Sequence, residues 1–167
     1  MSSSKKLTKL LFIVYLIALT WIIVFKDTIP FTEMGHMRNI NLEPFQAPSR
    51  INGQIDYSEM IMNIVIFIPY GIYAGILLKK WHLIQKIQLF FVTSLFFEMT
   101  QYILAVGASD ITDIINNTLG GIVGLIIFWL LNKLIRNKIR IHKFINVFAF
   151  IGTVSMVVLL LIIFLYL

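Results

Sequence analysis

The chain is dominated by five apolar segments, each close to the roughly 20 residues that a helix needs to cross the hydrocarbon core of a bilayer. The segments cover about residues 7–25, 58–78, 83–104, 111–131 and 143–167. The composition is 59% hydrophobic and only 13% charged, which is far more apolar than a soluble domain. Because the apolar residues come in long blocks, we predict one all-α membrane domain over residues 1–167, a polytopic bundle of five transmembrane helices.

The composition also excludes several kinds of function. The chain contains no cysteine, so disulfides, thiolate catalysis and cysteine-based metal sites are excluded. The net charge is +6, but the basic residues flank apolar segments and no recognition motif accompanies them, so we expect no nucleic-acid partner. No cofactor or metal motif is present, and we predict neither.

The lysine and arginine residues predict the direction of each span. Eleven of the 14 lie at the amino terminus, between the second and third spans, or between the fourth and fifth. The positive-inside rule then places the amino terminus in the cytoplasm and, with five spans, the carboxyl terminus outside. Residues 26–57 would form an extracytoplasmic loop. Its turn formers, including Pro44 and Gly53, predict an irregular structure that folds over the outer mouth of the bundle.

Polar and acidic side chains lie within these apolar segments, near their predicted outer ends. They are Asn63 in the second span, Glu98 and Gln101 in the third, and Asp110, Asp113 and Asn117 at the start of the fourth. An ionisable group in a membrane span costs on the order of a few kcal/mol and usually faces a bundle interior or a wet cavity. We therefore predict an outward-facing polar pocket for a ligand, with Arg38 and Asn41 of the outer loop at its mouth.

Most of these residues also have a structural interpretation. Asp110 with Asp113 is typical of a capped helix start. Glu98 can be a hydrogen-bonded structural acid, and the two asparagines can join helices at about 0.6 kcal/mol each. The acids also offer the oxygen ligands that hard cations take, but without a recognised loop spacing. Both interpretations of the polar residues stay open at this point.

Two pairs of glycines predict where two helices approach each other. Gly71 and Gly75 lie in the second span, and Gly120 and Gly124 in the fourth. Such small-x-x-x-small spacing lets helix backbones come close together. We predict that the second and fourth spans meet there and form a floor beneath the polar residues. Pro69 is expected to kink the second span.

Four blocks of sequence, taken in order, resemble the VanZ-like family of membrane proteins. They are R-x-x-N-L-x-P-F from Arg38, N-x-x-x-F-x-P-x-G from Asn63, E-x-x-Q from Glu98, and D-x-x-D-x-x-x-N-x-x-G-x-x-x-G from Asp110. The likeness covers about residues 10–131 and leaves the last span, about 143–167, unmatched. Many members carry an arginine just before the paired aspartates, where this chain has Gly107-Ala108-Ser109. Arg38 is then the obvious source of a cation beside the acids.

The resemblance implies a protein of the bacterial cytoplasmic membrane that lowers susceptibility to teicoplanin-type lipoglycopeptide antibiotics. Such drugs carry a lipid tail and act at the outer membrane face. An outward-facing pocket is well placed to bind or remodel a lipoglycopeptide, a lipid-linked cell-wall precursor or membrane lipids, which is our preferred interpretation. Two other classes stay open. One is an intramembrane enzyme of lipid or cell-wall precursor metabolism, with Glu98 or Asp113 as general base, and the other is a small transporter. The sequence indicates no oligomeric state.

Overall fold

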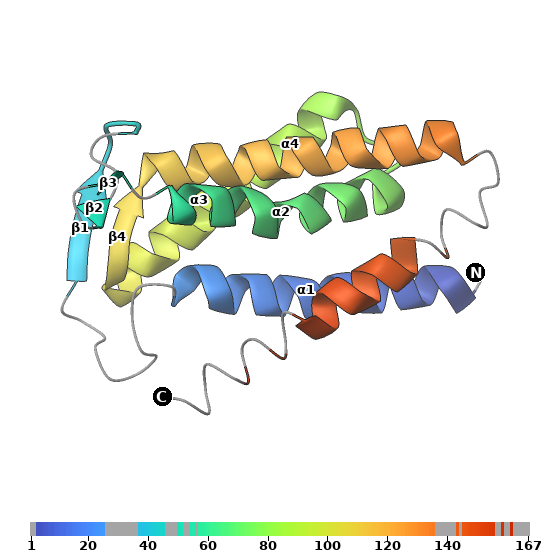
Figure 1. Cartoon of the computed structure of the whole chain (residues 1–167), viewed down its shortest axis with the longest axis horizontal. Coiled ribbons are helices and arrows are strands. Elements are labelled where there is room, and N and C mark those ends of the chain that lie inside the picture. Colours follow the sequence, from blue (N-terminus) through green and yellow to red (C-terminus); the bar gives the residue numbers. More distant parts are fainter. Residues whose placement is uncertain are drawn as a thin grey trace.

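Four long helices form the body of the molecule in the computed structural model. The structure describes residues 3–25, 37–45, 50–51, 54–55, 57–135, 143, 145–155, 158 and 161. They are α1 (Ser3–Val24), α2 (Ser58–Leu77), α3 (Leu83–Leu104) and α4 (Ile111–Leu134). All four are long and apolar enough to cross a membrane. The predicted helical bundle is confirmed, and its first four helices lie where the apolar segments placed them (Figure 1).

A further apolar helix covers Ile145–Ser155 and contacts α1. The Thr8 hydroxyl donates a hydrogen bond of 2.7 Å to Oδ1 of Asn146. Figure 1 shows this helix in orange-red against α1. Eleven residues rise only about 17 Å, less than the width of a bilayer core, and most of residues 156–167 lie outside the described part of the chain. A fifth span therefore remains a prediction.

The ends of α3 and α4 have local causes. The backbone N–H of His82, just before α3, donates to Oε1 of Gln85 at 2.9 Å, as in a capping box. The helix ends at Ala105, whose φ of 52° is the left-handed conformation that terminates many helices. Asp110 caps the start of α4. A tight reversal thus connects α3 to α4 through only a few residues.

Strands replace the irregular structure expected at one end of the bundle. β1 (Met37–Asn41) pairs in parallel with β4 (Val106–Asp110), in the register Met37↔Val106 to Asn41↔Asp110. β2 (Arg50–Ile51) and β3 (Gln54–Ile55) form a second, antiparallel pair. Figure 1 shows the strands crossing the bundle end, with β1 farther from the helices than β4. A parallel pair needs a long crossover, and here α2 and α3 supply it. That this segment is extracytoplasmic remains a prediction.

The helices α2 and α4 approach each other backbone to backbone. A Cβ atom added to Gly71 would overlap the carbonyl oxygen of Gly121 and would lie 2.8 Å from Cα of Gly124. A Cβ on Gly120 would overlap the carbonyl oxygen of Ile64. Because these obstacles are backbone atoms, only glycine permits the contact at these positions, and the two helices are held at close range beside the polar residues.

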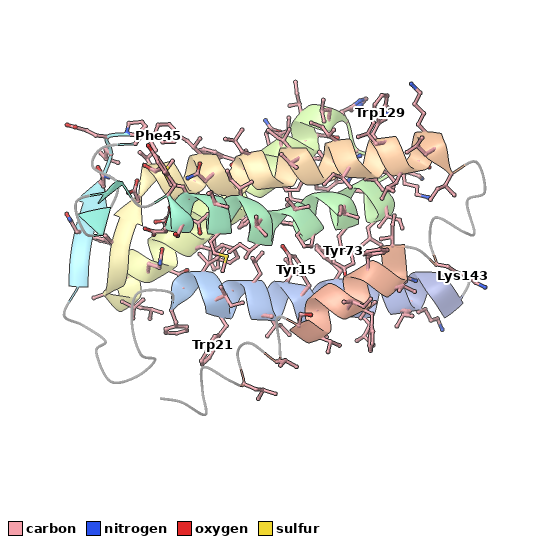
Figure 2. The ribbon with its side chains drawn as sticks, viewed as in Figure 1. Tyr15, Trp21, Phe45, Tyr73, Trp129 and Lys143 are labelled. Carbon is pink, nitrogen blue, oxygen red and sulfur yellow. The ribbon has the colours of Figure 1, made fainter. Side chains whose placement is uncertain are left out.

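Aromatic side chains fill the middle of the bundle. Tyr15 of α1 and Tyr73 of α2 have ring centroids 5.6 Å apart, and Figure 2 shows both between α1 and the other helices. Tyr70 meets Phe90 of α3 edge to face at 5.1 Å. Gly75 leaves room for the Phe128 ring. This packed aromatic layer lies between the polar residues at the strand end and the opposite end of the bundle.

Candidate functional site

The predicted polar residues of the helices meet at the bundle end that the strands cross. We use the name polar cluster for Asn63, Ser94, Glu98, Gln101, Asp113, Asn116 and Asn117, which come from three helices and are at most 4% exposed. Four of them, Ser94, Glu98, Gln101 and Asn117, have no exposed surface. The described residues therefore form a closed cluster, and an open pocket remains a prediction.

An asparagine and an aspartate join α2 to α4 within the polar cluster. Nδ2 of Asn63 donates to Oδ1 of Asp113 at 2.6 Å. Both side chains are buried, so the hydrogen bond forms in a medium of low dielectric, where a bond to a carboxylate is strong. The pair lies near the glycine contact, since Asn63 immediately precedes Ile64, whose carbonyl oxygen faces Gly120. The close approach of the two backbones and this polar pair thus support one another.

A second polar pair joins α4 to α3. Nδ2 of Asn117 donates to the Ser94 hydroxyl oxygen at 2.9 Å. Ser94 lies one turn before Glu98 on the same face of α3, but it was not among the residues predicted for the site. A single serine in an apolar helix carries little signal, because it commonly bonds to its own helix backbone. Asn116 was also missed. Because Asn116 follows Asp113 by three residues, helical spacing could have placed both on the same face of α4.

Glu98 and Gln101 each bind a backbone group at the end of another element. The backbone N–H of Asp110 donates to Oε2 of Glu98 at 2.8 Å. Nε2 of Gln101 donates to the carbonyl oxygen of Ile23 at 2.9 Å, in the last turn of α1. Helix ends leave backbone groups without intrahelical partners, and leaving them unpaired away from water is costly. Part of the polar cluster therefore stabilises the connections between helices.

Asp110 caps α4 and also holds the loop Asn41–Phe45. Its Oδ1 accepts the backbone N–H of Thr112 at 2.7 Å, which confirms the capping interpretation. Its Oδ2 accepts Nδ2 of Asn41 at 3.0 Å. The backbone N–H of Phe45 also donates to the Thr112 hydroxyl oxygen at 3.0 Å. The loop Asn41–Phe45 is thereby held against the first turn of α4 at both of its ends.

Three buried amide atoms make no hydrogen bond within the described part of the chain. They are Oε1 of Gln101, Oδ1 of Asn117 and Nδ2 of Asn116. A buried polar group without a partner costs roughly 1–3 kcal/mol. A bound ligand or an ordered water would recover that free energy. The polar cluster therefore has hydrogen-bonding capacity beyond the bonds that join its helices.

Two further expectations concern the position of Arg38 and a possible metal site. Arg38 lies in β1 in register with Gly107, beside the segment where the family resemblance leads one to expect an arginine. Its side chain is outside the described structure, so its pairing with Asp113 stays a prediction. Across the residues that the structure describes, no group of three or more acidic or histidine side chains is placed to hold a metal ion.

Comparison with known proteins identifies relatives along most of the chain. The VanZ/LLP1 family profile matches residues 12–132. The chain is also 37% identical over 158 residues to Protein VanZ of Enterococcus faecium, and the alignment covers 93% of this chain and 92% of that protein. No solved structure matches the chain. The matched region contains the whole polar cluster and all four strands.

Proposed function

The chain belongs to the VanZ/LLP1 family, and from this premise we propose that it lowers susceptibility to teicoplanin-type lipoglycopeptide antibiotics by binding or remodelling an envelope or lipid component at the polar cluster. The apolar helices and the relative make it a multi-pass membrane protein of bacteria. The observation that carries the proposal is the burial of unpartnered amide groups at the junction of three helices.

The free amide atoms suggest what kind of ligand group the cluster takes. Oε1 of Gln101 and Oδ1 of Asn117 are acceptors without a described donor, so a ligand hydroxyl or N–H group would satisfy them. The amide group of Gln101 cannot be rotated to exchange its oxygen and nitrogen, because Nε2 already donates to the backbone carbonyl of Ile23. Nδ2 of Asn116 is a donor without a described acceptor, so the ligand is one whose groups both donate and accept hydrogen bonds, such as the hydroxyl groups of a sugar.

Binding requires the polar cluster to open. The loop Asn41–Phe45 attaches to α4 through two described hydrogen bonds, to Asp110 and to Thr112. A net contribution of about 0.5–1.5 kcal/mol from each hydrogen bond is small enough for a ligand to offset. Release of this loop from α4 is the route of access that the proposal requires.

The hydrogen bonds of the two buried acids favour binding over catalysis. Glu98 holds the residue that caps α4, and Asp113 holds α2 through Asn63. Both carboxylates therefore have structural partners that a freely acting general base would not need. The variants Glu98→Gln and Asp113→Asn separate the two functions. Loss of resistance with intact ligand binding would favour a chemical step, while loss of both supports a binding site.

We place the polar cluster at the outer face of the membrane. The lysines at the start of α1, in the α2–α3 connection and at the end of α4 all lie at the opposite end of the bundle (Figure 1), as the positive-inside rule requires for a cytoplasmic end. Because the chain has no cysteine, single cysteines report the orientation. A membrane-impermeant thiol reagent should label Asn39→Cys in intact cells and Lys80→Cys only after permeabilisation. The reverse pattern would contradict this orientation.

Resistance measurements with matched variants test the proposed function. Gln101→Ala and Asn117→Ala should lower the inhibitory teicoplanin concentration of a host that expresses the protein. Gln88→Ala and Asn132→Ala change the same residue types at exposed positions of the same helices, and they should behave like the parent. Full resistance in the first two variants, at equal abundance in the membrane, would refute the role of the cluster.

A further inference from the structure

Exposed aromatic side chains gather at the strand end of the bundle, and each comes from a different part of the chain. The group consists of Trp21 near the end of α1, Phe45 after β1, Tyr57 before α2 and Tyr102 near the end of α3. Each is between 36% and 52% exposed. Aromatic residues are enriched where the hydrocarbon core meets the lipid headgroups. The group therefore indicates the level of that boundary at this end of the molecule.

The attachment of Phe45 to α4 gives an independent indication of depth. Its backbone N–H bonds to Thr112, in the first turn of α4. With 24 residues, α4 is about 36 Å long, against a hydrocarbon core of about 30 Å. The excess of roughly 6 Å, shared between the two ends, places Thr112 within one helical turn of the hydrocarbon boundary. Phe45 is consequently at the headgroup level and not in bulk water.

The loop holds its apolar side chains outward in a defined conformation. Phe45 has a φ of 59°, which is rare for a bulky residue and needs support from its surroundings. The hydrogen bonds to Asp110 and Thr112 supply that support. Leu42 is 72% exposed and Phe45 52% exposed. In water, two large apolar side chains on a fixed loop are unfavourable, whereas among acyl chains they are not.

We propose that the loop Asn41–Phe45 inserts the side chains of Leu42 and Phe45 among the lipid headgroups and upper acyl chains of the adjacent leaflet. The occupant of this surface is lipid, because the loop is hydrogen-bonded to the first turn of α4, a helix long and apolar enough to cross a membrane. Figure 2 shows Phe45 and Trp21 toward the strand end and Trp129 toward the other end. β1 is farther out and lies in water. The proposal does not depend on ligand binding at the polar cluster.

Spin labels on single cysteines measure this insertion directly. Leu42→Cys and Phe45→Cys, each carrying a nitroxide, are reconstituted in vesicles of phosphatidylcholine and phosphatidylglycerol. Ile103→Cys provides the lipid-exposed reference and Asn39→Cys the water-exposed reference. Molecular oxygen concentrates in the bilayer, while the nickel complex Ni-EDDA stays in water. The labels at Leu42 and Phe45 should collide more often with oxygen than with Ni-EDDA, as at Ile103, and Asn39 should show the reverse.

Two results would overturn the proposal. The first is that the labels at Leu42 and Phe45 are as accessible to Ni-EDDA as the label at Asn39, which would place the loop in water. The other is protection from both reagents, which would indicate a protein partner. Phe45→Trp covers the case in which cysteine at Phe45 disturbs the loop. With the three native tryptophans replaced by phenylalanine, brominated lipids should quench its fluorescence, and unquenched emission would also refute insertion.

Discussion

Replacement of Gly71 by alanine is the most direct test of the packing that supports the polar cluster. The new Cβ would overlap the carbonyl oxygen of Gly121 and would lie 2.8 Å from both Cα of Gly124 and the backbone nitrogen of Leu125. Favourable contacts between carbon atoms occur at about 3.5–4.0 Å. All three obstacles are backbone atoms, so α2 and α4 must separate by roughly 1 Å to admit the methyl group.

The expected loss of stability follows from two opposing terms. Overpacking typically costs about 1–3 kcal/mol, and the rigid obstacles here place Gly71→Ala near the upper value. Alanine also recovers about 1 kcal/mol of helix propensity relative to glycine. The expected net destabilisation is therefore about 2 kcal/mol. Gly152→Ala is the matched control, because its Cβ would meet no atom within 4 Å, and it should gain up to about 1 kcal/mol.

Thermal unfolding of the purified protein in detergent measures the difference between the two variants. At about 2–4 °C per kcal/mol for a protein of this size, Gly71→Ala should unfold roughly 4–8 °C below the parent. Gly152→Ala should unfold at or above the parent temperature. Teicoplanin resistance should fall with Gly71→Ala, since the Asn63–Asp113 hydrogen bond spans the same helix pair. An unfolding temperature of Gly71→Ala equal to that of Gly152→Ala would refute the backbone contact.

Three further substitutions test individual hydrogen bonds. Asn63→Ala removes the donor to Asp113 and should destabilise the protein by about 1–3 kcal/mol in the same unfolding assay, with Asn63→Asp more damaging because it opposes two carboxylates. Asp110→Ala removes the cap of α4 and the acceptor of Asn41. It should cost about 0.5–2 kcal/mol and increase protease cleavage in the segment between α1 and α2. Thr8→Val breaks the contact with Asn146 and should lower stability by about 1 kcal/mol, measured by thermal unfolding.

Each of these predictions has an opposing result. If Asn63→Ala unfolds at the same temperature as the parent protein, the hydrogen bond from Asn63 to Asp113 does not contribute to stability. Unchanged protease sensitivity in Asp110→Ala would show that other contacts hold the loop. Thr8→Ser keeps the hydroxyl group and is the control for Thr8→Val. Equal stability of the two variants would show that this hydrogen bond does not stabilise the contact between α1 and the helix Ile145–Ser155.

The sequence alone was sufficient to predict the four long helices, because each is encoded locally. A run of about 20 apolar residues satisfies its own backbone hydrogen bonds as a helix and needs no partner to do so, and α1 to α4 lie where such runs occur. The rise per residue also predicted that Asn63, Glu98 and Asp113 lie toward one end of the bundle. Glycine spacing marked the faces of α2 and α4 that the structure shows in contact.

Only the tertiary structure decided which groups bind to one another. β1 and β4 are separated in the chain by two complete helices, and the small residues of the Gly107-Ala108-Ser109 segment showed no strand pattern. Gln101 binds a carbonyl group 78 positions earlier in the chain, and Asn117 selects Ser94 on another helix. Hydrogen bonds of this kind depend on how the helices are rotated and spaced. The packing of the whole bundle sets that arrangement, and no single segment contains it.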